Sequence, residues 1–133
     1  MAGSLNELSK YRYERALEEL KNARDVFNAG SYKLSLNRSY YAIFHAMRSV
    51  NVLDEFDSSK HSGVIAHFNQ FHVKTGDFEK IASKIIQNAM EMREHADYDD
   101  FFLASKTDAE EQMSRADEFL GYVKTYLEDK EII

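Results

Sequence analysis

The segment from Ser31 to Leu53 carries an apolar repeat that predicts one long helix. At about 100° per residue, its apolar side chains gather on one face of that helix. These side chains are Leu36, Tyr40, Ile43, Phe44, Met47 and Val50. A stripe of this kind is typical of a core helix, so we expect the rest of the chain to pack around this segment.

The opposite face of this helix lacks the lysines and glutamates that are common on a surface helix. Arg38 and His45 are seven residues, or about two turns, apart and share this face, with Tyr41 beside them. A strip of small side chains runs along one edge and consists of Ser39, Ala42, Ala46 and Ser49. Small side chains let helices approach closely, so we expect this strip at the interface of a homodimer.

Four further segments repeat apolar residues at three- and four-residue spacing and predict helices. They are residues 5–29, 60–73, 78–95 and a last helix that begins at the capping-box pair Thr107 and Glu110. Gly30 is expected to end the first helix, and residues 96–105 are expected to be irregular. The sequence has no period-two pattern typical of a strand.

The same repeat predicts the orientation of individual side chains. In the first helix we expect Leu17 to point inward and Glu19 to point outward. In the fourth helix we expect Ile81, Ala89 and Met92 to point inward. The fold class that follows is all-α: an up-and-down bundle of four to five helices, formed as a single domain over residues 1–133.

The composition agrees with this fold class and limits the function. The 133 residues include no proline, which suits uninterrupted helices, and no cysteine, which excludes thiol chemistry and suits a reducing compartment. No apolar run approaches the roughly 20 residues that span a bilayer, and the N-terminus has no hydrophobic signal region, so we expect a cytoplasmic protein that binds no membrane. The formal net charge of −6 argues against a broad nucleic-acid surface but leaves room for a local basic site.

Arg38 and His45 are the first candidates for chemistry. Arginine offers a forked, permanent charge for phosphate, and histidine exchanges protons near neutral pH. Together they suit phosphodiester chemistry. The alternative is a solvated arginine and a histidine that is hydrogen-bonded at a helix interface.

A second polar cluster lies at the end of the fourth helix, where Asp97 and Tyr98 follow Arg93. Arg93 would supply a second phosphate contact, and an acidic residue would fix its orientation. The alternative is a helix end at which Arg93 offsets the dipole and pairs with Asp97. Lys60 and His61, at the start of the third helix, are placed to bind an anion through exposed amides.

The histidines near the third helix argue against a metal site. His61, His67 and His72 are six and five residues apart, whereas a helical site prefers a spacing of four or a glutamate three residues before the histidine. We therefore predict no metal. The sequence also has no Gly-rich phosphate loop, nucleophile elbow or zinc-protease motif, so no cofactor is expected.

The segment from Asn37 to Val50, NRSYYAIFHAMRSV, resembles the signature helix of the HEPN family, the higher eukaryotes and prokaryotes nucleotide-binding domain. The similarity extends over Gly30 to Tyr32, Lys60 to Val64, Phe68, Val73 to Gly76, and Arg93 with Ala96 to Asp99. More narrowly, the chain resembles the small stand-alone prokaryotic branch, whose genes often neighbour a minimal nucleotidyltransferase.

The resemblance implies a helical bundle that dimerises and, in many members, a metal-independent endoribonuclease. The family motif is an arginine, four to six residues, and then a histidine, and six residues separate Arg38 from His45. By this resemblance the two are catalytic, one pair from each protomer in a shared cleft: the histidine moves the 2′-hydroxyl proton, and the arginine stabilises the phosphorane. The expected substrate-binding residues are Tyr41, Lys60, His61, Arg93, Asp97 and Tyr98.

Two positions depart from the pattern of the nuclease members. Ser39 follows the arginine where many members carry Asn, Asp or His, and Met47 stands where some present a tyrosine for adenylylation by the partner. Two interpretations therefore stay open. One is a toxin-like ribonuclease that acts on RNA as a homodimer. The other is a non-catalytic subunit that presents nucleotide or substrate to a minimal nucleotidyltransferase, its antitoxin partner.

Overall fold

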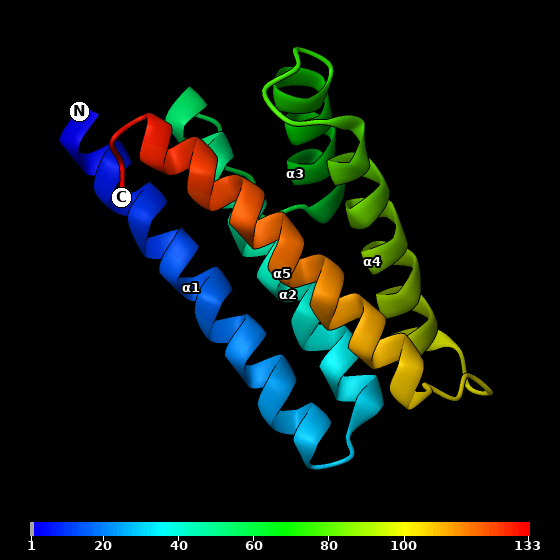
Figure 1. Ribbon diagram of the computed structural model, residues 1–133. Coiled ribbons are helices and arrows are strands. Elements are labelled where there is room, and N and C mark those ends of the chain that lie inside the picture. Colours follow the sequence, from blue (N-terminus) through cyan, green and yellow to red (C-terminus); the bar gives the residue numbers. More distant parts are fainter. Residues whose placement is uncertain (1) are drawn as a thin grey trace.

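The computed structural model describes residues 2–133, and this range contains five α-helices and no strand (Figure 1). The helices are α1 (Ala2–Asn28), α2 (Tyr32–Asn51), α3 (His61–Phe68), α4 (Lys80–Tyr98) and α5 (Lys106–Asp129). A short 3₁₀ helix, η1 (Val52–Asp54), follows α2, and a π-helix, η2 (Asn69–Val73), follows α3. The predicted all-α bundle is confirmed.

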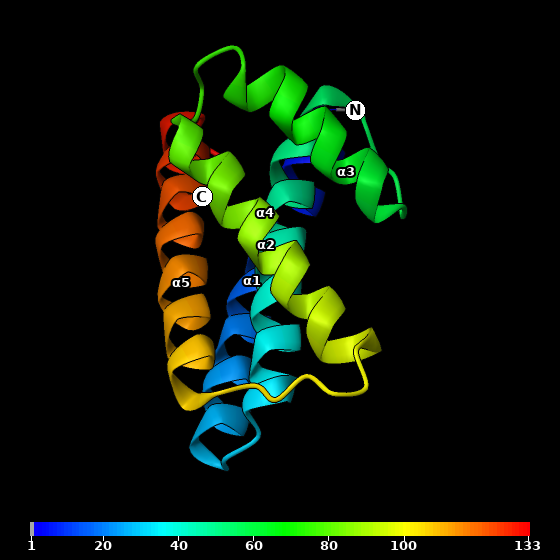
Figure 2. The ribbon, with the colours of Figure 1, turned by 90° about the vertical axis from the view of Figure 1, so that its right-hand side faces the viewer.

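Helix α2 is the centre of the bundle and packs against each of the other four helices. Its predicted apolar face is buried throughout, from Leu36 to Val50, and apolar side chains of α1, α3, α4 and α5 complete the same core. α1, α2 and α5 run side by side along the molecule (Figure 1). α3 crosses the end of the bundle at which α2 finishes (Figure 2). The prediction that α2 is the central helix is therefore confirmed.

Two local signals mark the helix ends. Gly30 has a φ of +84°, the left-handed conformation that favours glycine, and the amides of Gly30 and Ser31 donate to the carbonyls of Phe27 and Val26 at the end of α1. At the start of α5, the capping box is formed by Ser105 and Asp108 and not by the predicted pair Thr107 and Glu110. The helix begins earlier because Ser105 already satisfies an exposed backbone amide.

Three predicted orientations are wrong. Leu17 and Ile81 are exposed, whereas Glu19 is buried. In α4, Ala82 points inward in place of Ile81, together with Ile85 and Ile86. The apolar repeat misled here because a small alanine at a close helix contact carries less apolar weight than the isoleucine beside it.

The strip of small side chains on α2 also has a different role from the one predicted. Ser39, Ala42, Ala46 and Ser49 are all 0% exposed within the single chain. The Ser9 hydroxyl of α1 donates to the Ser49 carbonyl at 2.6 Å, so this strip lies against α1. The four residues let α1 approach α2 closely, and the assignment of these residues to an interface between two copies is wrong.

Each helix of residues 2–133 is too short or too polar to cross a lipid bilayer.

Candidate active site

Beyond its exposed first turn, the central helix meets solvent along one narrow strip. Between Ser35 and Val52, every residue is buried except five partly exposed ones: Asn37, Arg38, Tyr41, His45 and Arg48. They recur at three- and four-residue spacing and therefore share one face, which we call the α2 strip. The strip exists because α1 covers the small-residue face of α2 while α3, α4 and α5 cover its apolar face.

Arg38 is held in place by two neighbours. Its Nη1 forms an ion pair with the buried Glu19 of α1 at 2.9 Å, and its Nε and Nη2 donate to the Asn37 side-chain oxygen at 3.0 and 2.6 Å. A guanidinium group carries five N–H bonds, so two remain for another acceptor. One third of the side chain is exposed, which leaves a phosphate oxygen access to these donors.

His45 and Arg38 are both neighbours of the Tyr41 ring. The Arg38 guanidinium sits 5.1 Å from the centre of the Tyr41 ring, and the His45 ring centre lies 6.4 Å from it. Burial, followed by the nearby Arg15 charge, lowers the pKa of His45 to about 4. The imidazole is therefore neutral near pH 7 and has a lone pair that accepts a proton.

Arg93 of α4 reaches the strip from the other side. Its guanidinium lies 5.6 Å from the centre of the Tyr41 ring, its Nη2 donates to the Tyr41 hydroxyl at 3.4 Å, and its Nε pairs with Asp97 at 3.2 Å. Asp97 in turn accepts from Asn37 at 3.1 Å. Tyr98 joins more loosely, with its exposed ring 5.9 Å from Arg93. The structure thus brings the predicted cluster of α4 to the strip.

The start of α3 supplies one further predicted residue. His61 Nδ1 lies 2.7 Å from the Tyr40 hydroxyl, and the ring stacks on Phe44 at 4.3 Å. Burial, with a smaller effect of Arg93, lowers the pKa of His61. Lys60 is exposed at the N-cap of α3, and no contact within residues 2–133 joins its ammonium group to the strip. His61 belongs to the wall of the site, whereas Lys60 is only near it.

Sequence reasoning missed the contribution of α1. Arg12, Arg15 and Glu19 follow one another at three- and four-residue spacing, so they form a polar row that faces α2. Arg12 and Arg48 both donate to the Asp57 carboxylate, at 2.9 and 2.7 Å. These bonds, that of Arg12 first, lower the pKa of Asp57 to about 2. The spacing shows that the three residues share one face of α1, but not that this face lies against α2. The row gives the strip a local excess of arginine in an acidic chain.

A cavity of about 610 Å³ adjoins the strip at the start of α2. It lies between the α1–α2 turn and the segment that leads from α4 to α5. Its lining consists of residues 30–34 and 102–104 with Asn37 and Asp97. Because Asn37 and Asp97 also contact Arg38 and Arg93, the cavity and the strip adjoin each other through these two polar residues.

A sequence model described as the HEPN domain matches residues 9–126. The chain belongs to the HEPN family. The match covers the α2 strip and every predicted site residue, so the resemblance noted from Asn37 to Val50 is confirmed at the level of the family.

Three proteins are similar to this HEPN chain over most of their own length. A protein of Methanocaldococcus jannaschii with the name "Putative toxin MJ0142" is 28% identical to this chain. The alignment covers 95% of this chain and 91% of the M. jannaschii protein. A UPF0332 protein of Thermotoga maritima is 30% identical, over 94% of this chain and 97% of its own. A second M. jannaschii protein, "Putative toxin MJ0605", is 31% identical, over 87% of this chain and 86% of its own. The HEPN relatives therefore include proteins that are named as toxins.

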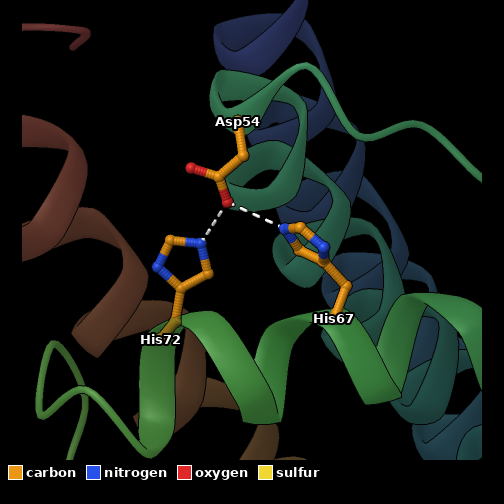
Figure 3. Close-up of side chains that lie close together, drawn as sticks. All are labelled: Asp54, His67 and His72. Atoms are coloured by element: carbon orange, nitrogen blue, oxygen red, sulfur yellow. Dashed lines mark hydrogen bonds and ion pairs between the residues drawn. The ribbon is translucent and has the colours of Figure 1, made fainter.

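One other cluster of this HEPN chain could hold an ion. Asp54 of η1, His67 of α3 and His72 of η2 converge at the end of the bundle, with one ligand atom from each within 4.8 Å of the others (Figure 3). The prediction of no metal depended on the spacing of these histidines in a regular α-helix. That argument does not hold for His67 and His72, because the helix between them changes to a π-turn.

Proposed function

We propose that this HEPN protein is a metal-independent endoribonuclease, toxin-like in its cellular role, with Arg38 and His45 as its catalytic residues. The observation that supports this best is the α2 strip: the partly exposed residues of an otherwise buried helix include both members of the arginine–histidine motif. Arg93 and Arg15 add positive charge on either side of it. The names of the toxin relatives agree with this role.

The proposed reaction uses a neutral His45 as the base and the charged Arg38 as the group that stabilises the transition state. Neutral His45 takes the proton of the ribose 2′-hydroxyl, and the 2′-oxygen attacks the adjacent phosphorus. The free N–H bonds of Arg38 stabilise the extra negative charge of the phosphorane. The bond to the 5′-oxygen then breaks, and the proton held by His45 passes to this leaving oxygen. The products are a 2′,3′-cyclic phosphate and a 5′-hydroxyl.

Mutation of the strip tests this proposal. Purified protein should cleave RNA in the presence of EDTA, and Arg38→Ala and His45→Ala should each abolish cleavage. Arg24→Ala is a matched control, because Arg24 forms its ion pair with Asp117 at 3.2 Å, outside the strip. RNA with 2′-O-methyl groups should resist the wild type because its nucleophile is blocked. Cleavage that survives both strip substitutions would contradict the proposal.

We further propose that the active form is a homodimer. The small-residue strip is not available for this contact, but the segment after α4 is: Phe101 and Leu103 are 94% and 89% exposed. This segment follows Asp97 and lines the cavity beside the α2 strip, so a second copy that covers it would lie next to Arg38. Replacing both residues with aspartate should give a folded monomer in light scattering. A monomeric wild type would contradict the dimer.

The second candidate is a binding subunit for a minimal nucleotidyltransferase, and the cavity of about 610 Å³ favours it. That volume accommodates a nucleotide, and Arg93 with Tyr41 and Tyr98 offers a cation and aromatic faces for phosphate and base without any proton transfer. In this case wild type leaves RNA intact, and Arg38→Ala weakens nucleotide binding. A neighbouring gene for a small nucleotidyltransferase would support either candidate.

A further inference from the structure

A cluster of four side chains at the end of the bundle has no role in the proposed reaction. Asp54 Oδ2 lies 2.9 Å from His67 Nε2 and 2.6 Å from His72 Nε2 (Figure 3). On its other side, the His72 ring places Nδ1 at 3.0 Å from Asp77 Oδ2. His72 is 3% exposed, so these carboxylates and not water are the partners of its ring.

The π-helix explains why two histidines five residues apart face the same ligand. In a regular α-helix, a separation of five residues corresponds to about 140° around the axis, and the two rings would diverge. The π-turn from Asn69 to Val73 adds a residue to the turn and returns His72 to the side of His67 (Figure 3). π-turns inside helices frequently occur at functional sites.

The geometry around His72 is that of a metal ligand with a carboxylate behind it. Its Nε2 points to Asp54 Oδ2 at 2.6 Å, beside His67 Nε2, and its Nδ1 points away from them to Asp77 Oδ2 at 3.0 Å. With a metal ion between His72 Nε2 and Asp54, Nε2 would offer its lone pair to the metal while Nδ1–H donates to Asp77. A carboxylate behind a ligating histidine is the usual second partner in metal sites.

We propose that Asp54, His67 and His72 bind a divalent transition-metal ion, with Zn²⁺ as the preferred ion and Asp77 as the residue that orients His72. Two histidines and a carboxylate are a ligand set that zinc accepts, with water in the fourth position. Asp54 is exposed, so water reaches this position. Zinc bonds of about 2.0–2.1 Å place tetrahedral ligand atoms about 3.3 Å apart. Asp54 Oδ2 lies 2.9 and 2.6 Å from the two histidine nitrogens, and the three atoms lie within 4.8 Å of one another, so Asp54 must withdraw by less than about 1 Å while the two rings adjust their separation. The side chain of an exposed residue on a short 3₁₀ turn can make this movement.

The surroundings of this cluster suit a structural metal site that links separate helices. Phe56 stacks on His67 at 4.1 Å and holds that ring in place. The ligands come from η1, α3 and η2, so the ion would tie the end of α2 to the helix that crosses it. About 20 Å of helix separates Arg38 from η1, and about 10 Å separates His45 from it. The metal site is therefore separate from the proposed ribonuclease site, and its test does not depend on RNA cleavage.

Zinc titration of the untagged, EDTA-treated and dialysed protein tests this site. Calorimetry should show one Zn²⁺ bound per chain, and Co²⁺ should give the visible absorption of a four-coordinate ion. Asp54→Asn and His67→Gln should each weaken Zn²⁺ binding by more than about 100-fold, while circular dichroism confirms that both variants fold. His95→Gln should bind as the wild type does, because His95 is an exposed histidine that pairs with Asp99 and is no ligand.

Asp77 gives a second and finer test. Asp77→Ala should keep one Zn²⁺ per chain but bind it about 10- to 100-fold more weakly, since His72 loses its orienting partner. Two results would overturn the proposal. One is a folded wild type that binds no Zn²⁺. The other is Zn²⁺ binding that Asp54→Asn and His67→Gln leave unchanged.

Discussion

The protein places histidines in two opposite electrostatic settings. His45 lies on the α2 strip, where burial and then the Arg15 charge lower its pKa to about 4. Glu19 opposes this shift, and Arg48 and Arg12 add to it with smaller effects. His72 lies between the carboxylates of Asp54 and Asp77, at 2.6 and 3.0 Å. Neighbouring arginines favour the neutral ring of His45, whereas the carboxylates on both sides of His72 suit a ring that binds a metal ion.

The comparison shows that the neighbours, and not the histidine itself, decide which chemistry is available. A neutral imidazole among arginines can take a proton while those arginines attract a phosphate. An imidazole that is backed by a carboxylate is a good ligand for a cation. Both settings are built around the same helix: arginines of α1 and α4 flank the middle of α2, and acidic residues gather at its C-terminal end.

The largest expected effect is on the rate of RNA cleavage, which should depend on His45 and not on the histidines of the metal cluster. His45→Gln should lower the rate of RNA cleavage by about 10²- to 10⁴-fold, the usual contribution of a general acid or base, and should leave zinc binding intact. Arg38→Lys should also fail, because lysine keeps the charge but loses the planar fork. Initial rates on a fluorescent RNA measure both effects, with His95→Gln as the control. A cleavage rate of His45→Gln within a few-fold of the wild-type rate would contradict the catalytic role of His45.

The next effect is on stability and concerns the acidic setting. At a zinc concentration 100 times the dissociation constant, bound Zn²⁺ should raise the free energy of unfolding by about 2.7 kcal/mol. Urea titration with and without Zn²⁺ measures this difference. The same titration of His67→Gln should show no zinc effect. An equal gain in both proteins would mean that zinc binds elsewhere.

The third effect is a pH dependence of the free energy of unfolding that follows from the low pKa of His45. Its pKa is 6.5 in the unfolded chain and about 4 in the folded one, so the unfolded state binds more protons between these values. The free energy of unfolding should therefore fall as the pH drops from about 6.5 toward 4. Solvent screening of this partly exposed ring reduces the loss to about 1–2 kcal/mol. Urea titrations at pH 7 and 4.5 should show a smaller loss for His45→Gln, and equal losses would argue against the low pKa.

The smallest effect concerns Glu19, an acidic residue near His45. Glu19 raises the pKa of His45 and pairs with Arg38, so Glu19→Gln should lower that pKa further and release Arg38. An NMR titration of the imidazole protons measures the change. A pKa of His45 that rises in Glu19→Gln would show that the assigned electrostatics are wrong.

The sequence predicted the fold class, the central helix and its buried face because each depends on a repeat of large apolar residues within one helix. It also predicted that Arg38, Tyr41 and His45 share a face, because that follows from helical spacing. It did not predict which face α1 would cover. The small-residue strip looked free until the structure showed Ser9 of α1 bonded to Ser49.

The remaining errors came from features that have no local signal. The burial of Glu19 depends on its ion pair with Arg38, 19 residues along the chain, so a solvated glutamate was the natural expectation. The convergence of His67 and His72 depends on a π-turn, which a fixed angle of 100° per residue excludes. The exposure of Ile81 depends on the close contact that Ala82 makes possible.

The ends of the RNA products test the central claim most directly. A defined RNA should be incubated with the wild-type protein in EDTA, and the fragments should be analysed by mass spectrometry. If the α2 strip catalyses attack by the 2′-oxygen, each upstream fragment ends in a 2′,3′-cyclic phosphate and each downstream fragment begins with a 5′-hydroxyl. Intact RNA, or fragments with 3′-hydroxyl and 5′-phosphate ends, would contradict the account.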